Sequence, residues 1–421
     1  MADQTPGSKS KKPIPHDSPD PSEEVLAPPI TSPEPSSPFA FDLGDEEPAS
    51  TGIADVFPGE AAFRFAFLGA GQCGGRIADS FWKLGYRRVG AFNTTEADFD
   101  GLSPEISRWS VKEKGGASKD PESAARQIED KQGDIRDLMT RAWGDSFDYA
   151  LICAGLAGGT GSGSLPILIE SARKYMADKG MVPKVGAIVA LPSPKEGQRQ
   201  GRNAVTAFKK LLDLEVSPLI VLDNFRVQQS RRPGASELFP LANSYVSNLL
   251  HVFNQVPTKK GGIYTFDASE LGHLFDGGLV VMSVAQIPLA SLKGEADLTT
   301  YIREKLSSSL LAQVNLRKGR SGALVFMSDA QGMKLPIEWY EAGYKQLHDV
   351  LGAAYGRRTP TVLHRGLYED PALKQLRCYT LISELEPPLE CLLELAKEGG
   401  VDLPSPTLKG MGAWLGLGED S

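Results

Sequence analysis

Two glycine-rich segments, each placed directly after a short apolar run, constrain the fold of this chain more than any other feature. They are Gly69–Gly75 (GAGQCGG) and Gly155–Gly163 (GLAGGTGSG). Glycine permits tight turns and lets backbone N–H groups approach a phosphate at the positive end of a helix. A flexible linker is a poor explanation, because each segment lies between a buried strand and the start of a helix. The two segments therefore predict strand–loop–helix units that bind phosphate.

The first half of the chain alternates short apolar runs with longer amphipathic ones. The predicted strands are residues 63–68, 88–92, 149–154, 185–191 and 218–222. The predicted helices are residues 77–84, 121–142, 165–177 and 202–214. This alternation predicts a parallel sheet covered on both faces, with ligands at the carboxyl ends of the strands.

The second half begins with one long predicted helix, residues 239–256, in which apolar residues recur at helical spacing. After it we predict strands at 279–284, 323–327, 361–364 and 376–382, and helices at 298–314 and 337–351. The expected fold class is α/β: a parallel-sheet, Rossmann-like domain joined by a long central helix to a smaller mixed α/β domain. The expected divisions are a tail (1–60), the first domain (61–238), the central helix (239–260), the second domain (261–385) and a C-terminal tail (386–421).

Charge separates the N-terminal tail from the rest of the chain. The formal net charge is −8, and residues 1–60 hold 3 lysines, 12 acidic residues and 12 of the 30 prolines. Such a segment cannot bury enough apolar surface to fold, so we expect it to be disordered. The remainder is nearly neutral and has no basic block, which argues against a nucleic-acid binder. Since no apolar run is long enough for a membrane span or a signal peptide, we expect a soluble, cytoplasmic protein.

Cysteine and histidine give no sign of a metal centre or a disulfide framework. The four cysteines lie far apart without C-x-x-C pairing, and the five histidines are equally scattered. No metal-ligating residue is therefore assigned from the sequence.

The first glycine segment contains G-x-G-x-x-G, which also occurs in dinucleotide-binding proteins. That function requires an acid at the end of the second strand to hold the ribose. Here the strand ends in Asn93-Thr94-Thr95, with Glu96 only afterwards, so a dinucleotide-dependent oxidoreductase is a remote alternative. The second segment adds Thr and Ser hydroxyls to its glycines, and such a field of donors suits a polyphosphate.

In their order along residues 63–385, these motifs resemble the tubulin/FtsZ superfamily. Gly71–Gly74 is similar to the first phosphate loop of tubulins, and Gly158–Gly163 is similar to the signature loop of the superfamily. The resemblance implies GTP as the ligand, with Mg²⁺ inferred from the polyphosphate. It implies nucleotide contacts at Gly71, Gln72, Cys73, Gly74, Asn93, Gly116, Ala117, Gly158, Gly159, Thr160, Gly161, Ser162, Glu196, Asn224, Phe239 and Asn243.

The resemblance also implies a role for several of these residues. Gly116 and Ala117 would lie over the γ-phosphate, and Glu196 would hold the ribose hydroxyls. Asn224 would pair with the guanine edge, while Phe239 would stack on the base and Asn243 would complete its recognition. Taken alone, Phe239 is more typical of a core residue. Asp120 and Pro121, after the γ-phosphate loop, also fit an ordinary helix start.

Asp267 and Glu270 are the expected catalytic residues. In the superfamily the acid that orients the attacking water comes from the next subunit of a head-to-tail filament, and Asp267 and Glu270 have the spacing of that pair. The same i, i+3 spacing also predicts a helix cap at Asp267 completed by Glu270. The resemblance implies a GTPase whose hydrolysis is coupled to polymerisation, with other copies of itself as partners.

Three positions depart from the superfamily pattern: Thr95, Gln200 and Thr265. They leave open an alternative, a divergent GTP-binding scaffold or regulator with little turnover. In the tail, Phe39–Leu43 (FAFDL) is an apolar patch among acids that could dock a protein partner. Division, cell shape and segregation all stay open as the cellular process.

Overall fold

The computed structural model describes residues 55, 60–112, 116–306, 309–355 and 361–401. The tail patch Phe39–Leu43 lies outside the described residues, as do most of both predicted tails.

Six strands of the first half form the parallel sheet that the sequence predicts. Their order is β3-β2-β1-β4-β5-β6, and every neighbouring pair is parallel. All but β3 are almost wholly buried, which explains their continuous apolar sequences. The strands are β1 (Phe65–Ala70), β2 (Val89–Asn93), β3 (Ser107–Ser110), β4 (Tyr149–Gly155), β5 (Val185–Leu191) and β6 (Leu219–Asp223).

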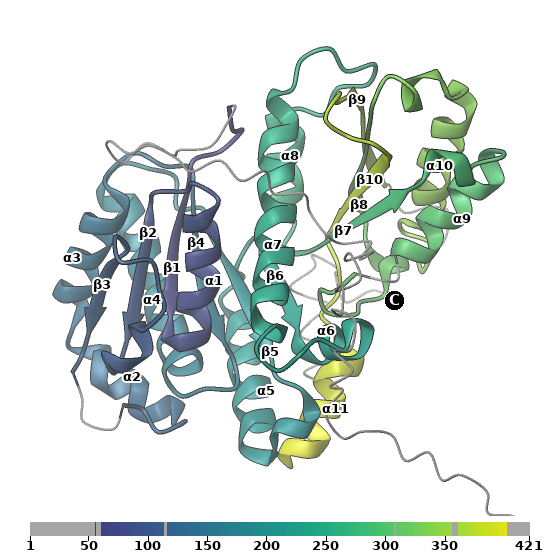
Figure 1. The fold of residues 1–421 in the computed structure, drawn as a ribbon. Helices are drawn as coiled ribbons and strands as arrows, with labels where there is room; N and C mark the ends of the chain where they lie inside the picture. The colour runs from purple at the N-terminus through teal and green to yellow at the C-terminus, as the bar shows by residue number, and fades with distance from the viewer. Residues whose placement is uncertain (1–54, 56–59, 113–115, 307–308, 356–360, 402–421) are drawn as a thin grey trace, which may run out of the picture. The chain divides into compact units, whose positions relative to one another are not determined.

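Helices connect these strands and pack on the sheet (Figure 1). They are α1 (Gly71–Lys83), α2 (Pro121–Glu129), α3 (Gln132–Trp143), α4 (Thr160–Asp178), α5 (Gln198–Asp213) and α6 (Asn224–Arg231). Apolar residues of α2, α3, α4 and α5 join the sheet in one buried cluster. Within it Trp143 is fully buried, and its indole N–H donates to the carbonyl of Phe67 at 3.0 Å.

A long helix, α7 (Leu238–Gln255), follows the first sheet. It contacts α1 through the carbonyl of Asn243, which accepts from the Ser80 hydroxyl at 3.5 Å. At its other end, the ring of Phe253 lies 6.4 Å from that of Tyr379 in the second half of the chain. The central helix therefore packs against both halves.

The second half forms a mixed sheet in the order β7-β10-β8-β9. Strand β10 is antiparallel to both β7 and β8, whereas β9 is parallel to β8. The first two residues of β7 also pair with β6, so the two sheets are continuous. The elements are α8 (Ala268–Phe275), β7 (Leu279–Ile287), α9 (Glu295–Leu306), β8 (Ser321–Ser328), α10 (Ile337–Val350), β9 (Val362–Glu369), β10 (Leu376–Ser383) and α11 (Leu389–Gly399). The predicted fold class is confirmed.

Some predicted elements are wrong in their bounds. The single helix predicted over 121–142 is two helices, because the chain leaves helical hydrogen bonding at Asp130 and Lys131. The helix predicted over 298–314 ends at Leu306. Beyond it the chain turns to bond β6: Leu311 bridges Leu222, and the Ala312 N–H donates to Val221 at 2.8 Å. Strand β3 and helix α6 were not predicted, because each is short and only partly apolar. None of the described helices has the length and apolarity to cross a membrane.

Candidate functional site

The first glycine segment ends β1 and begins α1 without a side-chain cap. Gly71 has φ +70°, and the preceding residue, Ala70, offers no hydrogen bond to the helix. Gly74 lies so close to β4 that a Cβ there would be 2.0 Å from the carbonyl oxygen of Cys153. The N–H groups of the first turn are therefore left for a ligand, on a loop fixed by backbone packing.

The second glycine segment repeats this arrangement at the end of β4. Helix α4 begins at Thr160, and its N-cap residue, Gly159, makes no side-chain cap. A Cβ on Gly159 would lie 2.7 Å from the backbone nitrogen of Asp120, and one on Gly163 would lie 2.0 Å from the Pro121 carbonyl oxygen. A Cβ on Gly158 would meet no atom within 4 Å. The segment is thus packed against the start of α2 on one side and open at Gly158.

The predicted phosphate-binding residues come together in space. A Cβ on Gly71 would lie 3.1 Å from the backbone nitrogen of Gly161. The Thr160 hydroxyl is 2.8 Å from that of Thr94, just after β2, and a Cβ on Gly116 would lie 3.4 Å from the same Thr94 oxygen. Four loops, one after each of β1, β2, β3 and β4, therefore present amide and hydroxyl groups to one place, which suits a polyphosphate.

Asp120 caps helix α2, as predicted by its interpretation as an ordinary helix start. Its carboxylate accepts from the N–H groups of Glu122 at 3.0 Å and Ser123 at 3.2 Å, with Pro121 at the first helical position. Ala117, in the loop before it, is 5% exposed. The capping interaction holds this loop against Gly159.

Asn203 is a site-supporting residue that the sequence did not reveal. It is 8% exposed, and its amide donates to the carbonyls of Lys119 at 3.0 Å and Ala157 at 3.2 Å. It thereby ties α5 to both the loop before α2 and the second glycine segment. An asparagine inside an amphipathic helix carries no motif, so only the fold shows its contacts.

Cys73 packs behind the first loop. A Cβ on Gly155 would lie 2.9 Å from its sulfur. Burial, together with the nearby charge of Glu196, raises the pKa of the Cys73 thiol to about 11. The thiol is therefore protonated at neutral pH and is a weak donor, not a nucleophile.

Asn93 and Gln72 differ sharply in accessibility. Asn93 is 1% exposed. Its side-chain oxygen, Oδ1, accepts from the Thr94 N–H at 2.8 Å, and its side-chain nitrogen, Nδ2, donates to the Asp98 carboxylate at 3.0 Å. Gln72 is exposed on the first turn of α1. In this structure the Asn93 side chain organises the loop after β2, and its contact with nucleotide stays a prediction.

Two of the residues expected around the ribose and base lie at the next strand ends. Glu196 is exposed after β5 and accepts from the Ser193 N–H at 2.9 Å. Asn224 is the first residue of α6 and is buried. The helix is capped by Asp223, which accepts from the N–H groups of Phe225 and Arg226. Burial raises the pKa of Asp223 despite these bonds.

Phe239 and Asn243 lie one turn apart at the start of α7. Phe239 is 40% exposed and Asn243 is half-buried. A spacing of i, i+4 places both side chains on one face of the helix. The core interpretation of Phe239 is therefore wrong, and its ring is available to a ligand.

Asp267 and Glu270 lie beyond the opposite end of α7. The Asp267 carboxylate accepts from the Glu270 N–H at 2.8 Å, and the Glu270 carboxylate accepts from the Asp267 N–H at 3.0 Å. This capping box at the start of α8 confirms the structural interpretation of the pair. Asp267 is exposed and Glu270 is half-buried. The structure does not bring them to the glycine loops of the same chain.

The comparison with protein families decides the identity of the first domain. Residues 64–231 match the model described as "Tubulin/FtsZ family, GTPase domain". This domain belongs to the Tubulin/FtsZ family. The GTPase activity of the family replaces the dinucleotide interpretation of G-x-G-x-x-G.

The similarity to known relatives extends beyond the first domain. It is 26% identical over 332 residues to the tubulin-like protein CetZ of Pyrococcus horikoshii, covering 76% of this chain and 85% of the relative. It is 27% identical over 234 residues to the cell division protein FtsZ 1 of Halobacterium salinarum, covering 56% of this chain and 54% of the relative.

Solved structures share the fold. A GTPγS-form protofilament of TubZ from Bacillus thuringiensis serovar israelensis has a TM-score of 0.67 at 19% identity, covering 81% of this chain and 91% of that one. A GTPγS-bound protofilament of CetZ2 from Haloferax volcanii has a TM-score of 0.65 at 19% identity, covering 80% of this chain and 98% of that one.

Proposed function

We propose that this chain is a cytoplasmic GTP-hydrolysing filament subunit that assembles head to tail. Asp267 and Glu270 of one subunit would complete the GTP site of the next. The solved GTPγS protofilaments of TubZ and CetZ2 support the assembly part of this proposal.

The length of α7 is the observation that carries the proposal. From Phe239 to Gln255 the helix advances 16 residues, about 24 Å at 1.5 Å per residue. Phe239, its second residue, lies at the predicted base site, and the Asp267–Glu270 pair follows its far end. With the nucleotide at the start of α7, carboxylates beyond the far end would be out of reach of the γ-phosphate in the same chain. In a head-to-tail stack, the far end of one subunit meets the nucleotide end of its neighbour.

The chemistry requires positioning more than covalent participation. Uncapped N–H groups of α1 and α4 would hold the phosphates, and Phe239 and Asn224 would hold the base. Glu270 would orient the attacking water when the neighbouring subunit presents it.

Mg²⁺ bound to the phosphates would neutralise developing charge, and the available donors fit it. The hydroxyls of Thr94 and Thr160 and the carboxylate of Glu96 are hard oxygen donors, the kind Mg²⁺ prefers. Among the described residues, no group of three or more His, Cys, Asp or Glu side chains could hold a metal. An ion held mainly by phosphate oxygens needs few protein ligands.

A second candidate, a GTP-binding scaffold with little turnover, is favoured by the surroundings of Thr95. The acid beside Thr95, Glu96, pairs with Lys112 at 3.3 Å. A lysine on the carboxylate next to the γ-phosphate loop competes with its use as a metal ligand. Measured turnover distinguishes the two candidates.

The test is the Glu270→Gln variant of the full chain. Glutamine keeps the shape and an acceptor oxygen for the Asp267 N–H but loses the charge. Because a positioned acid–base group contributes about a hundredfold or more, GTP turnover per assembled subunit should fall by about that factor. GTP affinity and assembly by sedimentation should be unchanged. Glu338→Gln, at an exposed acid of α10, serves as the matched control. Unchanged turnover in Glu270→Gln would remove the trans-acting acid from the proposal.

A further inference from the structure

His364 lies directly against the carboxylate of Glu270. It is on β9, and its Nδ1 is 3.0 Å from Oε1 of Glu270 on α8. The side chain of His364 is 14% exposed, and that of Glu270 is 30% exposed. The acid therefore has a half-buried partner on one side and an accessible edge on the other.

Both oxygens of the Glu270 carboxylate are engaged within the chain. Oε2 accepts from the Asp267 N–H at 3.0 Å, and Oε1 faces His364. Contacts from two directions fix the rotation of the carboxylate plane. Each oxygen has a second lone-pair site, so a water can still be bound. The acid is thus held in one orientation with acceptor capacity to spare.

The environment of the imidazole favours one tautomer. Nε2 of His364 is buried and has no hydrogen-bond partner among the described residues. A proton on Nε2 would be a buried donor without an acceptor, whereas a proton on Nδ1 is donated to Glu270. The neutral Nδ1–H form leaves no N–H donor of the ring without an acceptor. It donates to the carboxylate and leaves the negative charge of Glu270 in place.

The neighbouring groups supply packing without a competing cation. The ring of Phe266 lies 6.1 Å from that of His364, and the ring of His273 lies 6.0 Å away at 77°. Tyr368, also on β9, accepts from the Phe266 N–H at 2.7 Å through its hydroxyl. Asp267, His273 and Tyr368 are the other titratable groups facing the pair. Within the described part of the chain, Glu270 forms no ion pair with Lys or Arg.

We propose that His364 is a positioning residue for Glu270. By donating from Nδ1, it holds the carboxylate in the orientation that a water in the neighbouring subunit's GTP site requires, without cancelling its charge. This inference rests on the proposed function, because it takes Glu270 to be the trans-acting acid.

Two substitutions separate donation from packing. In His364→Asn the amide nitrogen occupies about the place of Nδ1 and can still donate, whereas His364→Leu has nearly the same volume and no donor. Since a small misplacement of a catalytic group costs on the order of tenfold to a hundredfold, His364→Leu should lower GTP turnover per assembled subunit by about that range. His364→Asn should stay within about threefold of wild type, by rescue of the same hydrogen bond.

Three readouts on the full chain make the result specific. Thermal melting checks that both variants fold, binding of a fluorescent GTP analogue checks the nucleotide site, and sedimentation with GTPγS checks assembly. We expect all three to match wild type, so that the loss appears in kcat alone. Wild-type turnover in His364→Leu, or an equal loss in His364→Asn, would overturn the positioning role. If Glu270→Gln also kept full turnover, the proposed function itself would fail, and the two failures are thereby distinguished.

Discussion

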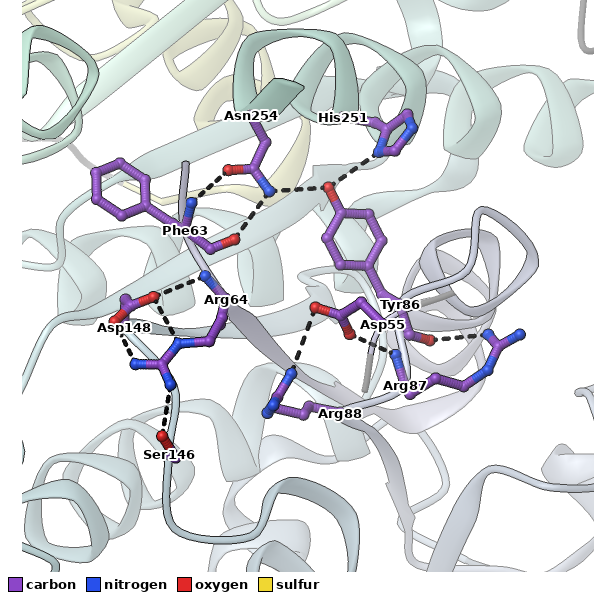
Figure 2. A network of polar contacts seen from close by, with 10 residues as sticks. All are labelled: Asp55, Phe63, Arg64, Tyr86, Arg87, Arg88, Ser146, Asp148, His251 and Asn254. Carbon is purple, nitrogen blue, oxygen red and sulfur yellow. Dashed lines mark hydrogen bonds and ion pairs between the residues drawn. The ribbon is translucent and has the colours of Figure 1, made fainter. Parts of the chain in front are cut away.

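The two ends of the parallel strands are built in opposite ways. At the carboxyl ends, glycine backbones pack against one another and two helices begin without side-chain caps. At the amino ends, side chains join the segments that precede the strands through ion pairs and hydrogen bonds (Figure 2). We call the amino ends the closed end and the carboxyl ends the open end. Arg64 pairs with Asp148 at 2.8 Å, and Arg88 pairs with Asp55 at 3.3 Å.

Asn254 links Phe63 and Tyr86 at the closed end (Figure 2). It is fully buried near the end of α7. Its amide donates to the Phe63 carbonyl at 3.0 Å and to the Tyr86 hydroxyl at 3.2 Å, while its oxygen accepts from the Phe63 N–H at 2.9 Å. His251, one turn earlier, lies 3.1 Å from the same hydroxyl. The end of the central helix is thereby fixed to the chain entering β1.

The difference between the two ends separates residues that stabilise the fold from residues that are available to a ligand. Groups whose hydrogen bonds are satisfied within the chain contribute to folding, and donors without partners are free for a ligand. Substitutions at the closed end should therefore change the free energy of unfolding. Those at open positions of the other end should change GTP binding.

The largest expected effect comes from comparing two glycines of the second glycine segment, Gly163, which is closely packed, and Gly158, which is open. Gly163→Ala would place a Cβ 2.0 Å from the Pro121 carbonyl oxygen, so we expect a loss of about 3 kcal/mol of stability. Gly158→Ala meets no atom within 4 Å and should leave stability within about 0.5 kcal/mol while weakening GTP binding. Urea unfolding and GTP titration measure the two quantities. Equal destabilisation by both substitutions would break the distinction between packed and open glycines.

The next prediction compares two asparagines near opposite ends of α7, Asn254 and Asn243. Asn254→Ala leaves part-buried backbone groups of Phe63 without these partners, which should cost about 2 kcal/mol, with GTP affinity unchanged. Asn243→Ala, at the end of α7 where we propose that the nucleotide binds, should weaken GTP binding with little effect on stability. A reversed pattern would contradict the separation of roles.

The sequence predicted the open end better than the closed end. Glycine runs such as Gly158–Gly163 are local signals, because the chain geometry that they permit is written in consecutive residues. The contacts of Asn254 and Asn203 join residues far apart in sequence, and nothing near them in the chain indicates a partner. His364 was missed for the same reason, since its partner Glu270 lies on another element.

Fold prediction failed where local and tertiary preferences differ. The apolar run around Leu310–Ala312 fits a helix by periodicity, but its backbone bonds β6 instead. Strand β3 is half-buried and only four residues long, too short for a clear pattern. Long elements with a consistent period, such as β5 and α7, were predicted within two residues of their bounds.

A pH effect of intermediate size is expected at the closed end. Burial lowers the pKa of His251 from 6.5 to about 4. The unfolded chain therefore binds a proton at this histidine at a higher pH than the folded chain does. The contribution of neutral His251 to the free energy of unfolding is complete above pH 6.5 and is lost as the pH falls toward 4. From pH 7 to 5 the loss should be about 2 kcal/mol. Urea midpoints at both pH values measure it.

His251→Gln provides the control, because glutamine does not titrate and can still bond the Tyr86 hydroxyl. The extra pH dependence of the wild type over this variant is the predicted quantity. An identical pH dependence in the two proteins would assign the effect to other groups.

The smallest effect is expected at Phe239. The side chain is 40% exposed, so Phe239→Ala should change the melting temperature little. Loss of stacking on the base should weaken GTP binding by about tenfold. Phe239→Trp keeps an aromatic face and should retain affinity. A large drop in melting temperature would instead place Phe239 among the core residues.

A mixing experiment tests most directly whether Glu270 acts in the neighbouring subunit. Glu270→Gln retains its GTP pocket but lacks the acid, and Gly158→Val retains the acid but should lack a usable pocket. Each variant alone should hydrolyse GTP slowly. If the acid acts in trans, an equimolar mixture forms interfaces that combine an intact pocket with an intact acid, and turnover should rise well above the mean of the two variants. A mixture that hydrolyses GTP only at that mean, while both variants sediment together, would contradict the account.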